Sequence, residues 1–269
     1  MDPLRITPIP AFTDNYLWLL ERGSDAAIVD PGDAAPVERA LAERGLTLAA
    51  ILVTHHHADH IDGLPALTRA HPGVPVYGPA AEQIRGVTHA LREGDRVTAL
   101  DVAFTVWEVP GHTLGHIAYV ADEPPPEHGP GFVLCGDTLF SAGCGRLFEG
   151  TAEQLHRSLQ RLATLPPDTR VYCTHEYTLA NLAFAAMVEP QRPELAAAIA
   201  EVRQRRRRHE PSLPSTIGRE RLINPFLRAT EPAVAQAAQR QAGAPLAGEI
   251  EVFAALRRWK DGFRAPADG

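Results

Sequence analysis

Short apolar runs separated by turn residues mark roughly the first two thirds of the chain. The runs at 16–21 and 26–29 flank the polar turn 22–25, a pattern that predicts a β-hairpin. The run at 48–53 is continuously apolar and ends at a group of histidines, which predicts a buried strand. Further runs of strand character lie at 102–109, 117–120, 132–134 and 171–173. The pattern predicts a sheet-forming region that ends near residue 175.

Helical patterns interrupt these strands and then replace them. Residues 36–44 and 61–70 carry apolar positions at helical spacing, and Thr151 with Gln154 forms the capping box of a helix that runs to about residue 165. Residues 122–130 form a proline-rich surface loop. From residue 178 onward Ala, Gln, Glu and Arg prevail, which predicts helices at 178–188, 194–208, 233–241 and 249–260. We expect an α/β region over residues 1–175 and a helical domain over residues 176–269.

Composition and charge exclude several classes of protein. The chain has 269 residues, is 45% hydrophobic and carries a formal net charge of −7, which is globular and argues against a nucleic-acid partner. It has no run of about 18 apolar residues and no signal-peptide pattern at its start, so we expect a cytoplasmic protein with no membrane partner. Cys135, Cys144 and Cys173 lack C-x-x-C spacing, which indicates free thiols. We interpret the arginines at 205–208 as a solvated helix face and expect a monomer.

A cluster of histidines carries the first chemical signal. Residues 54–60 read Thr-His-His-His-Ala-Asp-His, and they hold four of the 12 histidines. His55 and His57 lie on one side of an extended segment, and Asp59 and His60 follow where the chain turns into a helix. Imidazole nitrogens and carboxylate oxygens are ligands for zinc and other first-row divalent ions. A tag-like run or core histidines explain the segment less well, because a tag lies at a terminus and a core does not gather five polar groups at a strand end.

Three later predicted strands also end at residues that can bind a metal. They are followed by His112 and His116, by Asp137 and by His175. The candidate ligands are therefore His55, His57, Asp59, His60, His112, Asp137 and His175. Seven are too many for one tetrahedral ion but suit two ions that share a bridging ligand. We expect two divalent ions per chain, with zinc favoured and iron or manganese as alternatives.

The order T-H-x-H-x-D-H, G-H, G-D and a later His resembles the metallo-β-lactamase superfamily and, within it, the glyoxalase II family of hydroxyacylglutathione hydrolases. Supporting segments run along almost the whole chain, at 14–16, 29–33, 136–140, 143–146, 149–151, 172–177, 223–226 and 257–261. The resemblance implies a four-layer αβ/βα sandwich with metals at one edge of its two sheets. Residues 1–175 would form the catalytic domain and residues 176–269 a helical, substrate-binding C-terminal domain.

The resemblance also implies roles for the candidate ligands. His55, His57 and His112 would hold the first metal; Asp59, His60 and His175 would hold the second; Asp137 would bridge both. Asp59 would help orient the attacking water, which makes Asp59 and Asp137 the catalytic carboxylates. Asp30 would orient the metal-binding loop. His56 is interpreted as a polar neighbour, and His116 either supports a ligand or packs in the core.

For substrate binding, the resemblance implies cationic and hydroxyl donors toward the carboxylates of glutathione. The matching positions are Arg146, Tyr177, Arg257 and Lys260, and Lys260 is the only lysine of the chain. A solvated helix end is the alternative interpretation of Lys260. The family often has Lys at the position of Arg146 and Tyr at that of Phe148. An Arg still binds a carboxylate, whereas Phe148 lacks a hydroxyl donor, so glutathione affinity is the property most affected.

The implied reaction is hydrolysis of the thioester S-D-lactoylglutathione to D-lactate and glutathione, the second step of methylglyoxal detoxification. The leaving thiolate has a conjugate acid with a pKa of about 8.5, so it departs without a strong proton donor. The main alternative is a mono-iron enzyme of the same superfamily that resembles persulfide dioxygenases, which would not need Arg257 and Lys260. A lactamase would be secreted, a nuclease would need a basic cleft, and a structural metal module would leave no open coordination position.

Overall fold

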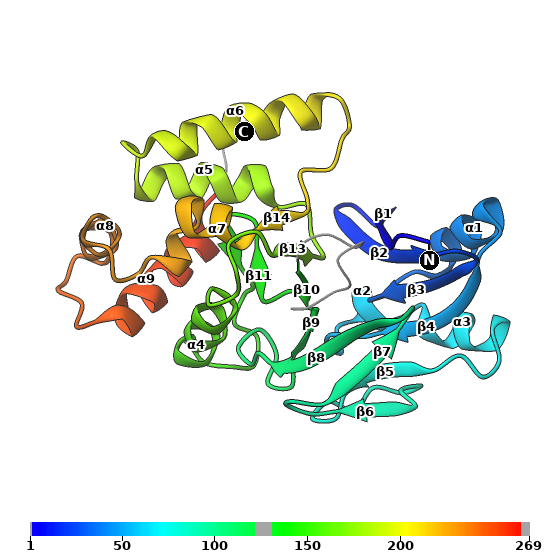
Figure 1. Ribbon diagram of the computed structural model, residues 1–269. Helices are drawn as coiled ribbons and strands as arrows, with labels where there is room; N and C mark the ends of the chain where they lie inside the picture. Colours follow the sequence, from blue (N-terminus) through cyan, green and yellow to red (C-terminus); the bar gives the residue numbers. More distant parts are fainter. Residues whose placement is uncertain (1, 122–130, 265–269) are drawn as a thin grey trace.

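Two six-stranded sheets form the centre of the computed structural model, which describes residues 2–121 and 131–264 (Figure 1). The predicted loop at 122–130 lies outside the described residues. The first sheet has the order β1 (Arg5–Ala11), β2 (Asn15–Arg22), β3 (Asp25–Val29), β4 (Thr47–Leu52), β5 (Val76–Pro79), β6 (His89–Leu91). The second has the order β14 (Ser215–Thr216), β13 (Arg170–Cys173), β10 (Phe132–Gly136), β9 (Ile117–Ala121), β8 (Val102–Glu108), β7 (Arg96–Ala99). A small hairpin pairs β11 (Leu139–Phe140) with β12 (Gly143–Cys144).

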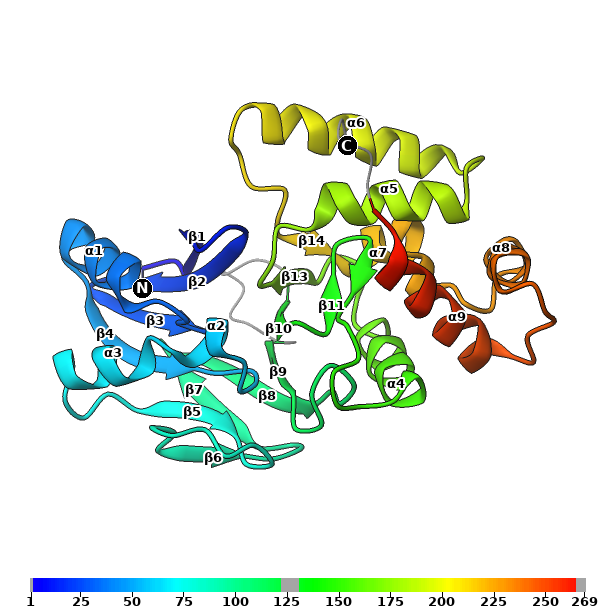
Figure 2. The ribbon, with the colours of Figure 1, turned by 180° about the vertical axis from the view of Figure 1, so that it is seen from behind.

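Helices cover the outer sides of the two sheets, as the two opposite views show (Figures 1 and 2). The helices beside the first sheet are α1 (Ala34–Arg44), α2 (Ala58–Ile61) and α3 (Leu64–Ala70). Beside the second sheet lies α4 (Ala152–Leu162), next to the C-terminal helices α5 (Thr178–Val188), α6 (Pro193–Arg207), α7 (Ile217–Ile223), α8 (Pro232–Ala242) and α9 (Glu249–Gly262), with a 3₁₀ turn at Pro225–Leu227. Of these, α6 and α8 pack on other helices. The architecture is the expected α/β sandwich of two sheets with a helical C-terminal region.

Alternation along β2 shows how the sequence builds the layers. Leu17 and Leu19 belong to the core that includes residues of α1, whereas Trp18 and Leu20 belong to the core that continues into the second sheet. Successive side chains of a strand point to opposite faces, so one strand supplies both cores. Trp18 packs edge-on against Tyr172 of β13 at 4.8 Å between ring centroids, and its Nε1 donates to the carbonyl oxygen of Cys173.

The ends of several strands meet at one edge of the sandwich. β4 runs parallel to β3, and β13 runs parallel to β10, so the residues after β4, β10 and β13 emerge at the carboxyl ends of their sheets. A bridge joins the sheets at this edge, where Asn15 pairs with His175 and Tyr16 N donates to Thr174 O at 2.7 Å. The fold therefore brings the polar strand-ending segments of the sequence together.

Most predicted elements are confirmed, including the hairpin at 22–25 and the capping box of α4, in which the Thr151 and Gln154 side chains each bond the other's backbone N–H. The helix predicted at 61–70 is present over a shorter range: α2 ends at Ile61 and α3 begins only at Leu64. Gly63 lies between them, and a Cβ there would be 2.3 Å from the Pro31 carbonyl oxygen, so the close approach requires glycine. The pattern also missed several elements, among them β1, β5, β6, β7, β14 and α7.

Candidate metal centre and substrate pocket

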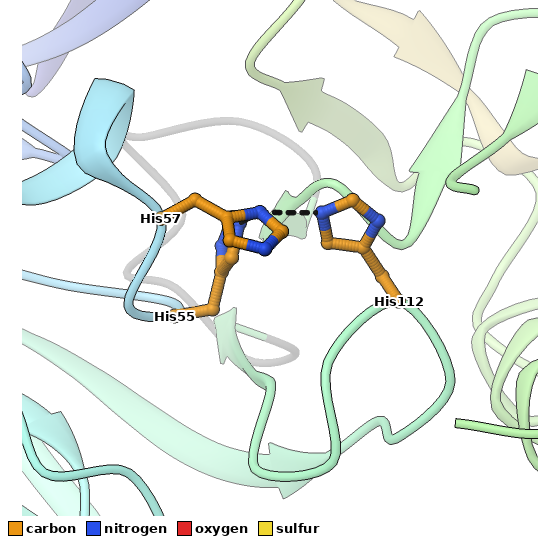
Figure 3. A group of neighbouring side chains, drawn as sticks. All are labelled: His55, His57 and His112. Atoms are coloured by element: carbon orange, nitrogen blue, oxygen red, sulfur yellow. Dashed lines mark hydrogen bonds between the residues drawn. The ribbon is translucent and has the colours of Figure 1, made fainter. Parts of the chain in front are cut away.

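Three histidines from two loops form one group of candidate ligands (Figure 3). His55 and His57 follow β4, and His112 lies in the loop between β8 and β9. His57 Nδ1 is 3.0 Å from both His55 Nε2 and His112 Nε2. Three imidazole nitrogens that face one point are a suitable donor set for a divalent cation.

A second group contains Asp59, His60 and His175. Asp59 and His60 lie on the short helix α2, and His175 follows β13. Asp59 Oδ2 is 3.6 Å from His60 Nε2 and 3.4 Å from His175 Nε2. The segments that carry these atoms follow β4 of the first sheet and β13 of the second, and they meet at the edge that the two sheets share.

Asp137, directly after β10, lies between the two groups. Its Oδ2 is 3.5 Å from His112 Nε2 and 3.3 Å from His175 Nε2, and its Oδ1 is 3.5 Å from His60 Nε2. Asp137 Oδ1 and His60 Nε2 are buried, and among the described residues neither has a hydrogen-bond partner. Buried polar atoms without partners are costly. Divalent cations at this position would satisfy them, so the donor set fits a metal centre.

Residues outside the candidate ligand set lie against the Nδ1 atoms of four imidazoles; at His60 the Asp30 carboxylate is an ion-pair partner without hydrogen-bond geometry. His55 Nδ1 is 3.1 Å from Thr54 Oγ1, His60 Nδ1 is 3.1 Å from Asp30 Oδ2, His112 Nδ1 is 2.9 Å from Arg146 O, and His175 Nδ1 is 2.8 Å from Asp14 Oδ1. Asp30 also accepts from the backbone and the hydroxyl of Thr54, which matches the orienting role expected for it. In these four histidines Nε2 faces the centre, whereas His57 presents its Nδ1.

The charges of the cluster's own side chains are unevenly distributed. Burial lowers the pKa values of His55, His57 and His112, so the first group is neutral and its lone pairs are available. Burial also opposes protonation of His175, but Asp137 outweighs it and raises the pKa of His175 to about 9. Burial alone would raise the pKa of Asp137, yet His175 and His60 hold it well below its usual range.

Two further histidines, His116 and His56, lie next to the candidate ligands. His116 is fully buried and stacks on His55, and its Nε2 accepts from the backbone N–H of Asp137 at 3.1 Å. It therefore contacts the two segments that carry His55 and Asp137. His56 lies between two carboxylates, 2.9 Å from Glu82 Oε2 and 3.1 Å from Glu149 Oε1.

A pocket of about 410 Å³ adjoins the metal centre. Its lining includes His112, Asp137, Phe140, Cys144, Arg146, Phe148, Tyr177, Asn181, Arg257, Lys260 and Phe263. All four predicted substrate-binding residues therefore line one cavity beside the cluster. The volume lies within the range of small-molecule sites, and cationic side chains in the lining suit an anionic ligand.

The cations of this pocket differ in how firmly they are held. The Arg257 side chain is 4% exposed and already donates to the carbonyl oxygens of Cys144 and Gly145 and to Asp261. Lys260 Nζ donates to Ala180 O at 3.1 Å, and burial, followed by the nearby Arg257, lowers its pKa to about 8. The Arg146 side chain is 64% exposed. Arg257 thus holds the Cys144–Gly145 segment in place. Arg146 and Lys260 keep N–H donors available for a ligand in the pocket.

Two aromatic residues shape the passage from the pocket to the metal centre. Tyr177 stacks on His175 with ring centroids 4.6 Å apart, and Phe148 is edge-on to His57 and His112 at 5.2 and 5.3 Å. Phe148 is 63% exposed, so its ring faces the open site and not the core.

Asp14 and Asn15 hold two candidate ligands, although the sequence pattern predicts no role for either residue. Asp14 holds His175, and Asn15 Nδ2 donates to Asp59 Oδ2 at 3.0 Å. Their only local signal is a polar pair at the start of an apolar strand, and their partners lie far along the chain.

Comparison with known families agrees with this geometry. Residues 12–175 match the family model of the metallo-beta-lactamase superfamily, and residues 176–263 match the model described as hydroxyacylglutathione hydrolase C-terminus. The fold and the site therefore define a metal-dependent enzyme of the metallo-β-lactamase superfamily. A relative from Cupriavidus metallidurans, named hydroxyacylglutathione hydrolase, is 54% identical over 269 residues, which cover 97% of this chain and 100% of the relative. The chain belongs to the hydroxyacylglutathione hydrolase family.

Solved structures show the same fold. ETHE1 from Myxococcus xanthus is 25% identical, with a TM-score of 0.63 over 98% of this chain and 92% of that one. TTHA1623, solved in a di-iron-bound form, is 28% identical, with a TM-score of 0.57 over 82% of this chain and 100% of that one. No helix within residues 2–121 and 131–264 has both the length and the apolar character needed to cross a membrane.

Proposed function

We propose that this chain hydrolyses S-D-lactoylglutathione to D-lactate and glutathione with two divalent metal ions. The observation that carries the proposal is the juxtaposition of two candidate ligand groups, joined at Asp137, with a cation-lined pocket. The full-length relative named hydroxyacylglutathione hydrolase supports this substrate over the mono-iron alternative.

The proposed ligands divide into two sets around Asp137. His55, His57 and His112 would hold one ion, Asp59, His60 and His175 would hold the other, and Asp137 would be shared by both. The di-iron form of TTHA1623 supports a count of two. Zinc is the ion we propose, because imidazole and carboxylate oxygen suit it, with iron and manganese as alternatives that the same donors accept.

When bound, the cations supply chemistry that the described side chains lack, since they lower the pKa of a water from about 15.7 to about 7 and neutralise charge on a carbonyl oxygen. The chain's own residues position the reactants. Asn15 holds the Asp59 carboxylate at the centre, where that carboxylate orients the attacking water. The glutathione thiolate departs without a proton donor, because the pKa of its conjugate acid is about 8.5.

Substrate binding would divide between the two parts of the chain. Residues 176–269 form the substrate-binding domain in this proposal and supply Tyr177, Arg257 and Lys260, whereas residues 1–175 carry the metal centre and add Arg146 from the β12 side of the pocket. Arg146 and Lys260 would bind the glutathione carboxylates, and Arg257 would hold the loop beneath them.

We also propose that the chain acts as a monomer in the cytoplasm. Every proposed ligand and pocket residue comes from one chain, so the site needs no second copy. Cys135, Cys144 and Cys173 are free and buried, which suits a reducing compartment.

Steady-state hydrolysis of S-D-lactoylglutathione, measured beside elemental analysis of the same preparation, tests the proposal. We expect hydrolysis that scales with metal content and approaches its maximum at two ions per chain. Oxygen consumption with glutathione persulfide at one iron per chain, without thioester hydrolysis, would replace it with the dioxygenase alternative.

A further inference from the structure

The β11–β12 hairpin connects the metal centre with the substrate pocket. It begins just after Asp137, and beyond its second strand the Arg146 carbonyl oxygen accepts from His112 Nδ1 at 2.9 Å. Gly145 packs so closely on the centre that a Cβ there would lie 2.0 Å from Asp137 O. The position of this hairpin therefore determines which nitrogen of His112 faces the metal centre.

The hairpin is too short to hold this position alone. Each of its strands has two residues, and Ala142 in the turn has a φ of 54°, a left-handed conformation that disfavours a side chain. Glu220 of α7 reaches this turn from the C-terminal region. Its Oε2 accepts from Ala142 N at 2.7 Å, and its Oε1 accepts from Ser141 Oγ at 3.0 Å.

Other C-terminal side chains complete the contact. Asn224 Nδ2 donates to Glu220 Oε2 at 3.1 Å, to Gly143 O at 2.9 Å and to Phe140 O at 3.2 Å. Ser215 Oγ also donates to Glu220. Glu220 and Asn224 are both fully buried, so no water is available to replace a lost bond.

We propose that Glu220 is a positioning residue for the reaction, acting through the β11–β12 hairpin on His112 and Arg146. Fixing the turn at Ala142 keeps the Arg146 carbonyl against His112 and sets where the Arg146 side chain meets the pocket. The inference rests on the proposed function for its effect on substrate, but its effect on metal affinity stands without it.

Glu189 provides a matched control within the same region. It is also a buried carboxylate, and it binds Arg228 and lies 3.5 Å from Arg192. None of its bonds among the described residues reaches the hairpin. Loss of Glu189 should therefore lower stability without moving the metal centre.

The experiment compares Glu220→Met, Glu220→Gln and Glu189→Met. Zinc affinity is measured by competition with a chromophoric chelator, KM and kcat with S-D-lactoylglutathione, and Tm by thermal unfolding. We expect Glu220→Met to weaken zinc binding about tenfold, the lower end of the effect of losing a group that orients a ligand, and to raise KM several-fold. Glu220→Gln should restore both, because an amide oxygen can accept from Ala142 N and its NH₂ can donate to a serine hydroxyl. Glu189→Met should lower Tm alone.

Wild-type zinc affinity and KM in folded Glu220→Met would overturn the proposal, as would equal losses in Glu189→Met. If Glu220→Met does not fold, Ser141→Ala removes one of the bonds to Glu220 and should weaken zinc binding at least twofold; unchanged affinity would overturn the proposal. Absence of thioester hydrolysis in the wild type would instead overturn the proposed function, and the zinc measurements would still test Glu220.

Discussion

The metal centre and the substrate pocket share His112 and Asp137 but are built in opposite ways. In the centre, buried imidazoles are held at Nδ1 by partners from other segments, such as Asp14 on His175 and Asp30 on His60. In the pocket, Arg146 and Phe148 are mostly exposed. The centre has one fixed geometry, as bond-breaking chemistry requires, whereas the pocket can adapt to a flexible tripeptide. Changes in the centre should therefore cost more than changes in the pocket.

The largest effect is expected from Asp137→Ala, which removes the one carboxylate between both ligand groups. Occupancy of at least one metal site should be lost, and kcat should fall by roughly a thousandfold, because the centre supplies several kcal/mol of transition-state stabilisation. Elemental analysis and kcat on one preparation check this. Full hydrolytic activity with one ion per chain would contradict the proposed two-ion centre.

Asp14→Ala should come next, because it leaves every proposed ligand in place and frees only His175 Nδ1. Losing such a partner typically weakens metal binding about 10–100-fold. Chelator competition measures the change, and Asp101→Ala, which removes an exposed carboxylate paired with Arg22, serves as the control. Equal zinc affinity in both variants would show that the Nδ1 contact does not hold the centre.

The pocket should respond to pH through Lys260. Its pKa of about 8 reflects burial and Arg257, with Arg146, Asp261 and Cys144 also facing the amine. The ammonium form binds a carboxylate below this pKa and is lost above it, so kcat/KM should fall as pH rises through about 8. The pKa of Lys260 is lower in the folded protein than the ordinary value of 10.5. Its contribution to the free energy of unfolding should therefore rise as the pH increases from about 8 to 10.5.

Lys260→Arg and Lys260→Ala separate the causes of this pH dependence. An arginine stays charged, so kcat/KM should become flat near pH 8. Lys260→Ala should raise KM about tenfold or more at pH 7 with kcat little changed, since a hydrogen bond to a charged group contributes about 1.5–3 kcal/mol. A persisting decline in Lys260→Arg would assign it to another group.

The smallest effect is expected from Phe148→Tyr. The ring is exposed beside His57 and His112, so a new hydroxyl would reach the pocket and not the core. One added neutral hydrogen bond contributes about 0.5–1.5 kcal/mol, so KM should fall a few-fold with Tm and metal content unchanged. A lower Tm with the same KM would show that the hydroxyl does not reach substrate.

The sequence could group the candidate ligands for a local reason. Each lies just past an apolar run, and strand ends meet at one edge of an α/β sheet, so the positions of His55, Asp137 and His175 along the chain are enough to group them. Asp14 and Glu220 could not be found this way, because their partners lie on distant segments and neither carries a periodic signal. Residue type alone does not encode such contacts.

The secondary-structure elements that the sequence pattern missed or misplaced also have physical explanations. β1 contains Pro8 and Pro10, which argue against a strand, yet an edge strand tolerates them because one side needs no ladder bonds. β14 has only two residues, too few for any period. The helix predicted at 61–70 breaks at Gly63 because of a tertiary contact with the Pro31 backbone, which helical spacing does not reveal.

The two residues of β14 also set an order of events during synthesis. They cover the free side of β13, but they leave the ribosome after all of α5 and α6. At about 5–20 residues per second, that delay lasts seconds. Until then the backbone of β13 is an open edge that another nascent chain could join. Pairing of β14 with β13 ends this interval, so a segment from the C-terminal region closes the exposed edge of the second sheet.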